Sequence, residues 1–251
     1  MRILLTNDDG VHAPGLELLE RIAAQLSDDV WVCAPAIEQS GTGHSLTLHL
    51  PVRLQQFAER RFAVAGTPTD AVNLALRKLF SDKRPDLVIS GINHGENLGD
   101  DVTYSGTISA AMEAALAGIP AIALSQALRT GGHGFAAAEG WAARVLRPLI
   151  DLQQARRTVI NVNFPAVAAD AVKGVRVVRQ GFHDYARGSL VEGTDPRGRP
   201  YYWFGLEDIE HTLDHGTDLE AVSDGYVSVT PLHLDLTHHG SLGQLAQAYD
   251  E

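Results

Sequence analysis

The feature that most constrains the fold is the alternation of short apolar runs with helical patterns along the first part of the chain. A first apolar run, residues 1–6, ends at Asn7-Asp8-Asp9-Gly10. Apolar residues at helical spacing follow from Pro14 to Leu26, and a second apolar run covers residues 30–34. Strand, loop, helix and strand in this order form the unit of a doubly wound sheet.

The alternation continues up to residue 164 and then stops. Further elements are expected as strands at 86–90, 119–124 and 159–164, as helices at 66–80, 105–116 and 136–147 (interrupted at Pro148), and as an inserted hairpin or edge strands within 46–65. We therefore predict an α/β fold with a Rossmann-like, doubly wound, mostly parallel sheet.

The chain of 251 residues suits a single domain, 1–251. We expect an α/β core at 1–173, followed at 174–251 by an extended hairpin arm, a late strand at 226–230 and a C-terminal helix at about 241–249. The arm would lie within 181–216, where Tyr201-Tyr202-Trp203-Phe204 is a candidate oligomer contact.

Composition narrows the class of function. The formal charge is −11, with 31 acidic and 20 basic residues, which disfavours binding to a nucleic-acid duplex. The single cysteine, Cys33, excludes an intrachain disulfide and fits a reducing compartment. We find no signal peptide and no run of about 20 apolar residues, so we expect a cytoplasmic protein without a membrane span.

Oxygen-bearing side chains follow several of the expected strands. They lie in Asn7-Asp8-Asp9-Gly10, in Ser40-Gly41 and in Gly91-Ile92-Asn93. The carboxyl ends of parallel strands meet at one edge of a sheet, and carboxylate, hydroxyl and amide oxygens suit Mg²⁺, Mn²⁺ or Ca²⁺ rather than zinc. Residues 7–10 are also a good turn sequence, and by themselves they do not decide between a plain turn and an acidic site.

The segment Ser105-Gly106-Thr107 opens the expected helix at 105–116. A helix start with small hydroxyl residues is a ready anion site, although a simple N-cap has the same sequence. A divalent cation beside an anion site predicts metal-assisted hydrolysis of a phosphate ester. His44 and His94 lie in the same loops, and we interpret them as fixing the loops rather than as general acids.

Several motifs, taken together and in order, carry a resemblance to a known family. They are residues 7–15, Ser40-Gly, Gly66-Thr-Pro-Thr-Asp, Ser90-Gly-Ile-Asn, Asn97-Leu-Gly-Asp-Asp, Tyr104-Ser-Gly-Thr, Asp195-Pro-Arg-Gly, Gly216-Thr-Asp, Gly225-Tyr-Val-Ser-Val-Thr-Pro-Leu and Asp235-Leu-Thr. The chain resembles the SurE family, survival proteins with nucleoside monophosphate phosphatase activity.

The resemblance implies one divalent metal per subunit, Mg²⁺ or Mn²⁺. Its implied ligands are Asp8, Asp9, Ser40 and Asn93, and the catalytic residues would be Asp8, Asp9 and Asn93. Substrate contacts are expected from Asn7, Gly41, Asn93, Ser105, Gly106 and Thr107. The implied reaction is hydrolysis of nucleoside 5′-monophosphates, with 3′-monophosphates and short polyphosphate as further substrates, in a homodimer or homotetramer assembled through the C-terminal region.

Two mechanisms stay open: attack of water on phosphorus with Asp8 as base or orienting group, or direct attack by Asp8. Other classes are weighed against these. A receiver-like signalling module needs an aspartate after the strand at 86–90, where Ser90-Gly91-Ile92-Asn93 stands. A haloacid-dehalogenase phosphatase needs two aspartates separated by one residue, whereas Asp8 and Asp9 are adjacent. A non-catalytic nucleotide-binding protein is the alternative that an activity assay would decide.

Overall fold

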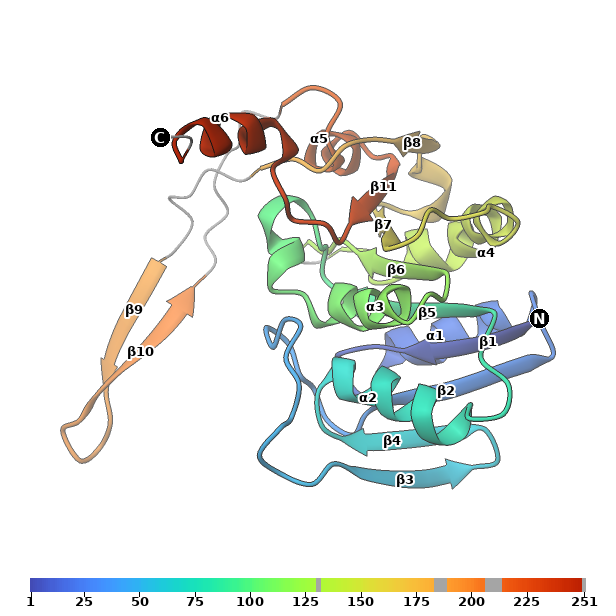
Figure 1. The fold of residues 1–251 in the computed structure, drawn as a ribbon. Coiled ribbons are helices and arrows are strands. Elements are labelled where there is room, and N and C mark those ends of the chain that lie inside the picture. The colour runs from blue at the N-terminus through green and yellow to red at the C-terminus, as the bar shows by residue number, and fades with distance from the viewer. Residues whose placement is uncertain (130–131, 183–188, 206–213, 250–251) are drawn as a thin grey trace.

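A nine-stranded sheet forms the centre of the protein (Figure 1). The computed structural model describes residues 1–129, 132–182, 189–205 and 214–249. The order of the strands is β3-β4-β2-β1-β5-β6-β7-β11-β8. Their bounds are β1 Arg2–Thr6, β2 Asp29–Pro35, β3 Arg53–Ala58, β4 Arg61–Ala65, β5 Leu87–His94, β6 Ala121–Gln126, β7 Thr158–Phe164, β8 Val175–Val177 and β11 Val227–His233.

The direction of chain winding reverses at β1. From β1 the chain moves outward to β2 and β4, and it then returns to place β5, β6 and β7 on the other side of β1. These strands are parallel, whereas β3 pairs antiparallel with β4 and β11 pairs antiparallel with β7. The predicted doubly wound, mostly parallel sheet is confirmed, and β1 and β5 flank its topological switch point, where such folds bind ligands.

Helices cover both faces of the sheet. One face packs against α1 (Pro14–Ala23) and α4 (Ala136–Ile150). The other packs against α2 (Pro68–Leu74), which continues as a π-helical turn at Ala75–Leu79, and against α3 (Gly106–Leu116). In β1, Ile3 and Leu5 point into the first layer and Leu4 into the second. Burial on both faces explains why β1 is an unbroken apolar run in the sequence.

Three details of the expected secondary structure are wrong. The strand expected at 86–90 continues to His94, and its pairing with β6 is irregular between Ser90 and Asn93. Glycine at position 91 allows this, because the backbone there comes so close to Leu124 that a Cβ would lie only 2.2 Å from the Leu124 carbonyl oxygen. Pro148 lies inside α4 instead of interrupting it; in the last turn its missing N–H removes at most one helical bond. Residues 46–50 are not a strand, and the hairpin consists of β3 and β4.

The predicted arm is a separate two-stranded antiparallel hairpin of β9 (Ser189–Thr194) and β10 (Pro200–Gly205), which lies apart from the sheet in Figure 1. The parts of the expected arm at 183–188 and 206–213 lie outside the described residues. The carboxylate of Asp195 accepts hydrogen bonds from the backbone N–H groups of Arg197 and Arg199 and so builds the hairpin turn.

The C-terminal segment adds α5 (Asp218–Ser223), β11 and α6 (Leu242–Gln247). The expected late strand and C-terminal helix are therefore present. Short 3-10 turns cover Gly99–Thr103, Ala169–Ala171 and His239–Ser241. Of the helices that the structure describes, none is long and apolar enough to cross a membrane.

The fit of α1 on β5 allows a test. A Cβ on Gly15, the second residue of α1, would lie 1.9 Å from the Ile92 carbonyl oxygen. We expect Gly15→Ala to lower the free energy of unfolding by about 3 kcal/mol through overpacking, measured by denaturant titration. At Gly243, the second residue of α6, a Cβ would have no atom of the described residues within 4 Å. Gly243→Ala is thus the control and should change stability by less than about 1 kcal/mol. Equal effects would contradict the packing argument.

Candidate metal and phosphate site

The adjacent carboxylates of Asp8 and Asp9 lie at the carboxyl end of β1, at the switch point. The backbone N–H of Gln39, which follows β2, donates to the Asp8 carbonyl at 2.8 Å. The backbone N–H of His94, the last residue of β5, donates to Asp9 Oδ2 at 3.2 Å. The acidic pair is therefore where the chain leaving β1 meets the ends of β2 and β5.

The start of α3 packs directly on Asp8. Thr107 Oγ1 donates a hydrogen bond to Asp8 Oδ1, and both residues are buried. A Cβ on Gly106 would lie 2.7 Å from Asp8 Cβ and 2.9 Å from Asp8 Oδ2, so only glycine allows this approach. Ser105 is the N-cap, and its hydroxyl accepts a hydrogen bond from Ile108 N at 3.1 Å. The sequence indicated an anion site at this helix start, and the anion that the structure places beside it is the Asp8 carboxylate.

Burial and mutual repulsion act on the acidic pair. Burial raises the pKa of the Asp8 carboxyl to about 6; the hydrogen bond from Thr107 opposes this and the charge of Asp9 adds to it. Burial also raises the pKa of Asp9, against the hydrogen bond from His94 N and the charge of His94, while the charge of Glu38 adds to the rise. Among the described residues, no lysine or arginine contributes to either shift. The site thus holds two poorly compensated negative charges, which is the electrostatic setting that a bound cation stabilises.

Asn7 and Gly10 shape the turn that presents both carboxylates. Asn7 is fully buried, and its Nδ2 donates to the Gly10 carbonyl at 2.9 Å. Gly10 has a φ of 102°, in the left-handed region that favours glycine. Residues 7–10 therefore form a turn, and the same turn carries the two carboxylates. Asn7 Oδ1 is a buried atom without a hydrogen-bond partner among the described residues, and a substrate contact by Asn7 stays a prediction.

The remaining expected ligands lie on the same edge of the sheet. Ser40 is exposed, and its hydroxyl donates to Glu38 Oε1 at 3.0 Å. Gly41 beside it is exposed, with a φ of 74°. Asn93 is half-buried in β5, and its Nδ2 donates to the Gly95 carbonyl at 3.0 Å, so a metal contact by Asn93, which would use its amide oxygen, stays a prediction. Within the described ranges, the side chains of Ser40 and Asn93 make no hydrogen bond to either aspartate.

The chemistry of this donor set fits a hard cation. Two carboxylates with neutral hydroxyl and amide oxygens are typical of Mg²⁺ or Mn²⁺ sites. In the part of the chain that the structure describes, no group of three or more His, Cys, Asp or Glu side chains could hold a metal ion. A zinc-like centre is accordingly not supported by the described residues.

The ring of each histidine in these loops contacts a residue outside the acidic pair, although the charge of His94 also lowers the pKa of Asp9. His44 Nε2 lies 3.3 Å from Glu113 Oε2, and the pKa of Glu113 is lowered, first by this hydrogen bond. The His94 ring packs at 6.0 Å from the Phe135 ring. Both contacts fit the interpretation that these histidines fix loops.

Sequence reasoning missed a buried amide network that holds Asn97, in the connection from β5 to α3. Asn97 N donates to Asn163 Oδ1 at 2.8 Å, and Asn97 Nδ2 donates to Ser125 Oγ at 2.7 Å. The side-chain amides of Asn161 and Asn163 both donate to the Asn97 carbonyl. Two asparagines within the otherwise apolar strand at 159–164 were the available signal, since buried amides need such partners.

A cavity of 370 Å³ lies at the opposite edge of the sheet. It is lined by residues 115–120 and 154–158, which precede or begin β6 and β7. Because the acidic pair is at the carboxyl ends of the strands, this cavity is not part of the candidate site.

Comparison with known proteins identifies the family. Residues 3–187 match the family model described as survival protein SurE. The chain belongs to the SurE family. It is 64% identical to 5′-nucleotidase SurE of Erythrobacter litoralis, with 100% of both chains covered. It is 57% identical to 5′-nucleotidase SurE of Rhizorhabdus wittichii, over 99% of this chain and 100% of that protein. The crystal structure of SurE protein from Aquifex aeolicus matches with a TM-score of 0.86 and 39% identity, covering 100% of both chains.

The raised pKa of Asp8 predicts how stability depends on pH in EDTA. The folded protein binds more protons than the unfolded chain between the ordinary pKa, 3.8, and about 6, so the Asp8 contribution to stability falls as pH rises through this range. Asp8→Asn keeps the acceptor for Thr107 and removes the titration. We expect the variant to gain up to about 3 kcal/mol over the wild type between pH 4 and pH 8, measured by denaturant titration. A stability difference that does not vary with pH would contradict the assignment.

Proposed function

We propose that this protein is a divalent-metal-dependent phosphatase that hydrolyses nucleoside 5′-monophosphates to nucleoside and inorganic phosphate. The observation that carries the proposal is the adjacent pair of the buried Asp8 and the half-buried Asp9 at the switch point, with the first turn of α3 packed on Asp8. Full-length relatives named 5′-nucleotidase SurE, at 57% and 64% identity, support the same activity. Hydrolysis of 3′-monophosphates and of short polyphosphate is part of the proposal.

We further propose that one Mg²⁺ or Mn²⁺ ion binds at this pair. Asp8, Asp9, Ser40 and Asn93 would hold it, since two carboxylates balance a divalent charge and the neutral oxygens complete the set. The raised pKa values of the two aspartates support this assignment, and the close packing of Gly106 on Asp8 holds that carboxylate at the switch point. When bound, the ion would polarise a phosphoryl oxygen and offset the charge of the substrate.

The residues around Asp8 have separable roles in this proposal. Thr107 fixes the orientation of the Asp8 carboxyl through Oδ1, which leaves Oδ2, over Gly106, to orient a water molecule or to take its proton. The N-terminus of α3 contributes partial positive charge, and Ser105, Gly106 and Thr107 would contact the phosphate. Asn7 and Gly41 are proposed as further substrate contacts, and Asn93 would serve both metal and phosphate.

Other classes fit the site less well. In a receiver domain an aspartate would end β5, whereas β5 here ends with Asn93 and His94. A metal-dependent protein that binds nucleotides without turnover stays the main rival.

We also propose that the chain functions as a single domain, 1–251, with its core at 1–173. A cytoplasmic location stays a prediction.

Phosphate release separates the enzyme from a binding protein. With nucleoside 5′- and 3′-monophosphates and Mg²⁺ or Mn²⁺, we expect release of inorganic phosphate that EDTA abolishes. Asp8→Ala should lower kcat/KM at least about 100-fold, which corresponds to about 3 kcal/mol of transition-state stabilisation. Thr42→Ala is a control in the Ser40 loop, because the hydrogen bond described for the Thr42 hydroxyl goes to the Gln39 carbonyl within the same loop.

The outcomes of this assay are distinct. Nucleotide binding without phosphate release would overturn the enzymatic proposal. An Asp8→Ala variant with full metal-dependent activity would exclude both open mechanisms. Recovery of phosphorylated Asp8 from acid-quenched turnover would select direct attack by Asp8 over attack by water.

We also propose a homodimer or homotetramer assembled through the arm and the C-terminal segment. The arm exposes Tyr201, Tyr202 and Trp203, and the segment after β11 exposes apolar side chains at Leu236, Leu242, Leu245 and Tyr249. Exposed apolar groups of this extent are typical of protein interfaces.

Light scattering tests the arm contact. Trp203→Lys should reduce the molar mass of the wild-type oligomer at micromolar concentration, since a lysine in a buried interface leaves its charge unpaired. Val177→Lys, on the exposed edge strand β8, is the control and should keep the wild-type mass. A wild-type monomer, or an unchanged mass for Trp203→Lys, would contradict the proposed contact.

A further inference from the structure

We propose that Asp218 is a positioning residue of the active site: its buried carboxylate joins the root of the hairpin arm to Gly99 and thereby sets where the first turn of α3 lies against Asp8. The inference rests on the proposed nucleotidase function of that site. It also gives a role to the Gly216-Thr-Asp motif, which neither the fold nor the metal site explains.

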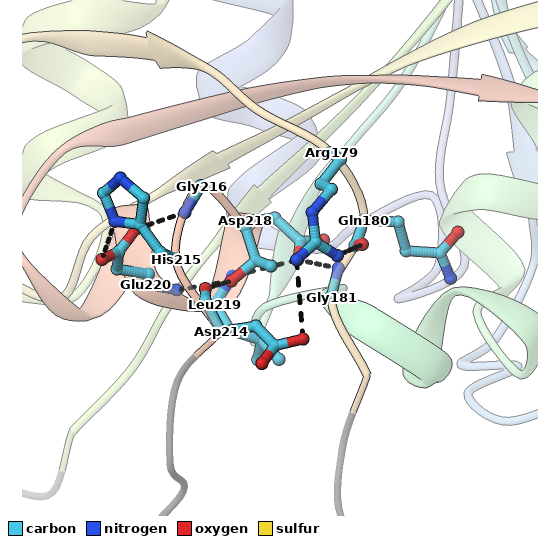
Figure 2. Close-up of polar contacts among 10 residues, drawn as sticks. Arg179, Gln180, Gly181, Asp214, His215, Gly216, Asp218, Leu219 and Glu220 are labelled. Carbon is cyan, nitrogen blue, oxygen red and sulfur yellow. Dashed lines mark hydrogen bonds and ion pairs between the residues drawn. The ribbon is translucent and has the colours of Figure 1, made fainter.

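The Asp218 carboxylate is surrounded by backbone donors from three segments. Asp218 is 0% exposed. Oδ1 accepts from Gly181 N at 2.7 Å and from Leu219 N at 3.0 Å, and Oδ2 accepts from Gly99 N at 3.1 Å. Figure 2 shows the carboxylate between Gly181 and Leu219. A carboxylate that accepts several N–H groups in a buried setting is held firmly, because charged hydrogen bonds are among the strongest in proteins.

The contact with Gly99 is reinforced from the arm side. Gln180 Nε2 donates to the Gly99 carbonyl at 2.8 Å, so both polar backbone atoms of Gly99 are bound by residues at the arm root. Gly181 packs closely at this point, since a Cβ there would lie 2.9 Å from Leu219 Cδ1 and 3.1 Å from Asp218 Oδ1. The two chain segments that lead to the arm meet here, since Asp218 N also donates to the Arg179 carbonyl at 3.0 Å.

Gly99 lies in the connection from β5 to α3. It is the first residue of the 3-10 turn Gly99–Thr103, which leads through Tyr104 to the N-cap Ser105 of α3. The Tyr104 carbonyl accepts from Gly43 N at 3.1 Å, which also ties this connection to the loop that carries Ser40. A shift of Gly99 would therefore be passed to both sides of the proposed metal and phosphate site.

A purely local role for Asp218 as a helix cap does not account for these contacts. The N-cap of α5 is Thr217, whose hydroxyl accepts from Glu220 N at 3.3 Å. The bond from Gly99 N to Asp218 Oδ2 spans 119 residues of sequence and contributes nothing to α5 itself. The carboxylate therefore connects the arm root to the active-site connection rather than only starting a helix.

Asp218→Asn in the full-length protein is the test. Asparagine keeps one acceptor but presents an NH₂ group to another backbone N–H, so it cannot accept from both Gly181 and Gly99. Glu220→Gln is the matched control: Glu220 lies on the same helix and accepts from Gly216 N at 2.7 Å, and the hydrogen bonds described for its carboxylate stay within residues 215–220. Amide hydrogen exchange of metal-free protein and the kinetics with adenosine 5′-monophosphate and Mg²⁺ are measured for both variants.

For Asp218→Asn we expect amide exchange at least about tenfold faster across residues 97–107, with β1 and β6 unchanged. We expect kcat to fall about tenfold while KM changes less than about threefold, as for misplaced catalytic groups. Glu220→Gln should resemble the wild type in both measurements. Exchange that rises only within 214–223, or equal effects of the two variants, would overturn the proposal.

Gln180→Ala keeps the test decisive if Asp218→Asn does not fold. It removes the bond to the Gly99 carbonyl and leaves the carboxylate in place. It should accelerate exchange over residues 97–107, and wild-type exchange there would count against the proposal. A wild type that releases no phosphate would overturn the nucleotidase function, whereas the exchange data would still decide whether Asp218 positions Gly99.

Discussion

The burial of the Asp8 carboxylate against the first turn of α3 is the interaction on which the rest of the site depends. It requires glycine at position 106 and a hydroxyl donor at 107, because any Cβ at 106 would collide with Asp8 and the buried charge needs a hydrogen bond. Thr107 reduces the electrostatic cost of burying the acid, but Asp9 next to it increases that cost. A site built this way is least stable when empty and ionised, which is a common condition of metal centres before the cation binds.

Along the strands of the sheet, the buried side chains change from apolar to polar towards this pair. On the face covered by α2 and α3, the row containing Leu4, Val88 and Val159 is apolar. Two residues further along each strand, the register aligns Thr6 with Ser90 and Asn161 with Thr230, all of them buried. Polar groups thus accumulate in the interior towards the carboxyl edge, where the amides of β7 hold the Asn97 carbonyl. This polar layer holds the connection from β5 to α3 from below, while the arm root holds it through Gly99.

Much of the fold could be predicted from the sequence because its signals are local. A strand buried on both faces must be apolar throughout, and a helix on the sheet must be apolar on one side, so the elements of the core were recognisable. The segments that were assigned wrongly have sequence patterns that fit both a loop and a strand. The glycine-rich stretch after Ser90 suits a loop, yet the same absence of a side chain at Gly91 lets β5 continue close to the Leu124 carbonyl. Leu46, Leu48 and Leu50 alternate as in a strand, but they are exposed along a segment held at Thr47 by Asp70.

The sequence by itself indicated the class of the fold through its local patterns, and its motifs indicated the family and, through that resemblance, the candidate ligands of the acidic edge. Residues 7–10 taken alone did not decide between a turn and an acidic site, and it was the other strand ends and the family resemblance that favoured the acidic site. Only the tertiary structure showed that the Asn7 amide builds the turn while Asp8 meets Thr107, 99 residues away in the chain. The link from Asp218 to Gly99 is likewise invisible in the sequence, since a buried carboxylate that binds backbone N–H groups places no requirement on the side chain of its partner. Contacts of this kind depend on the position of the backbone in space, which is set only when the chain folds.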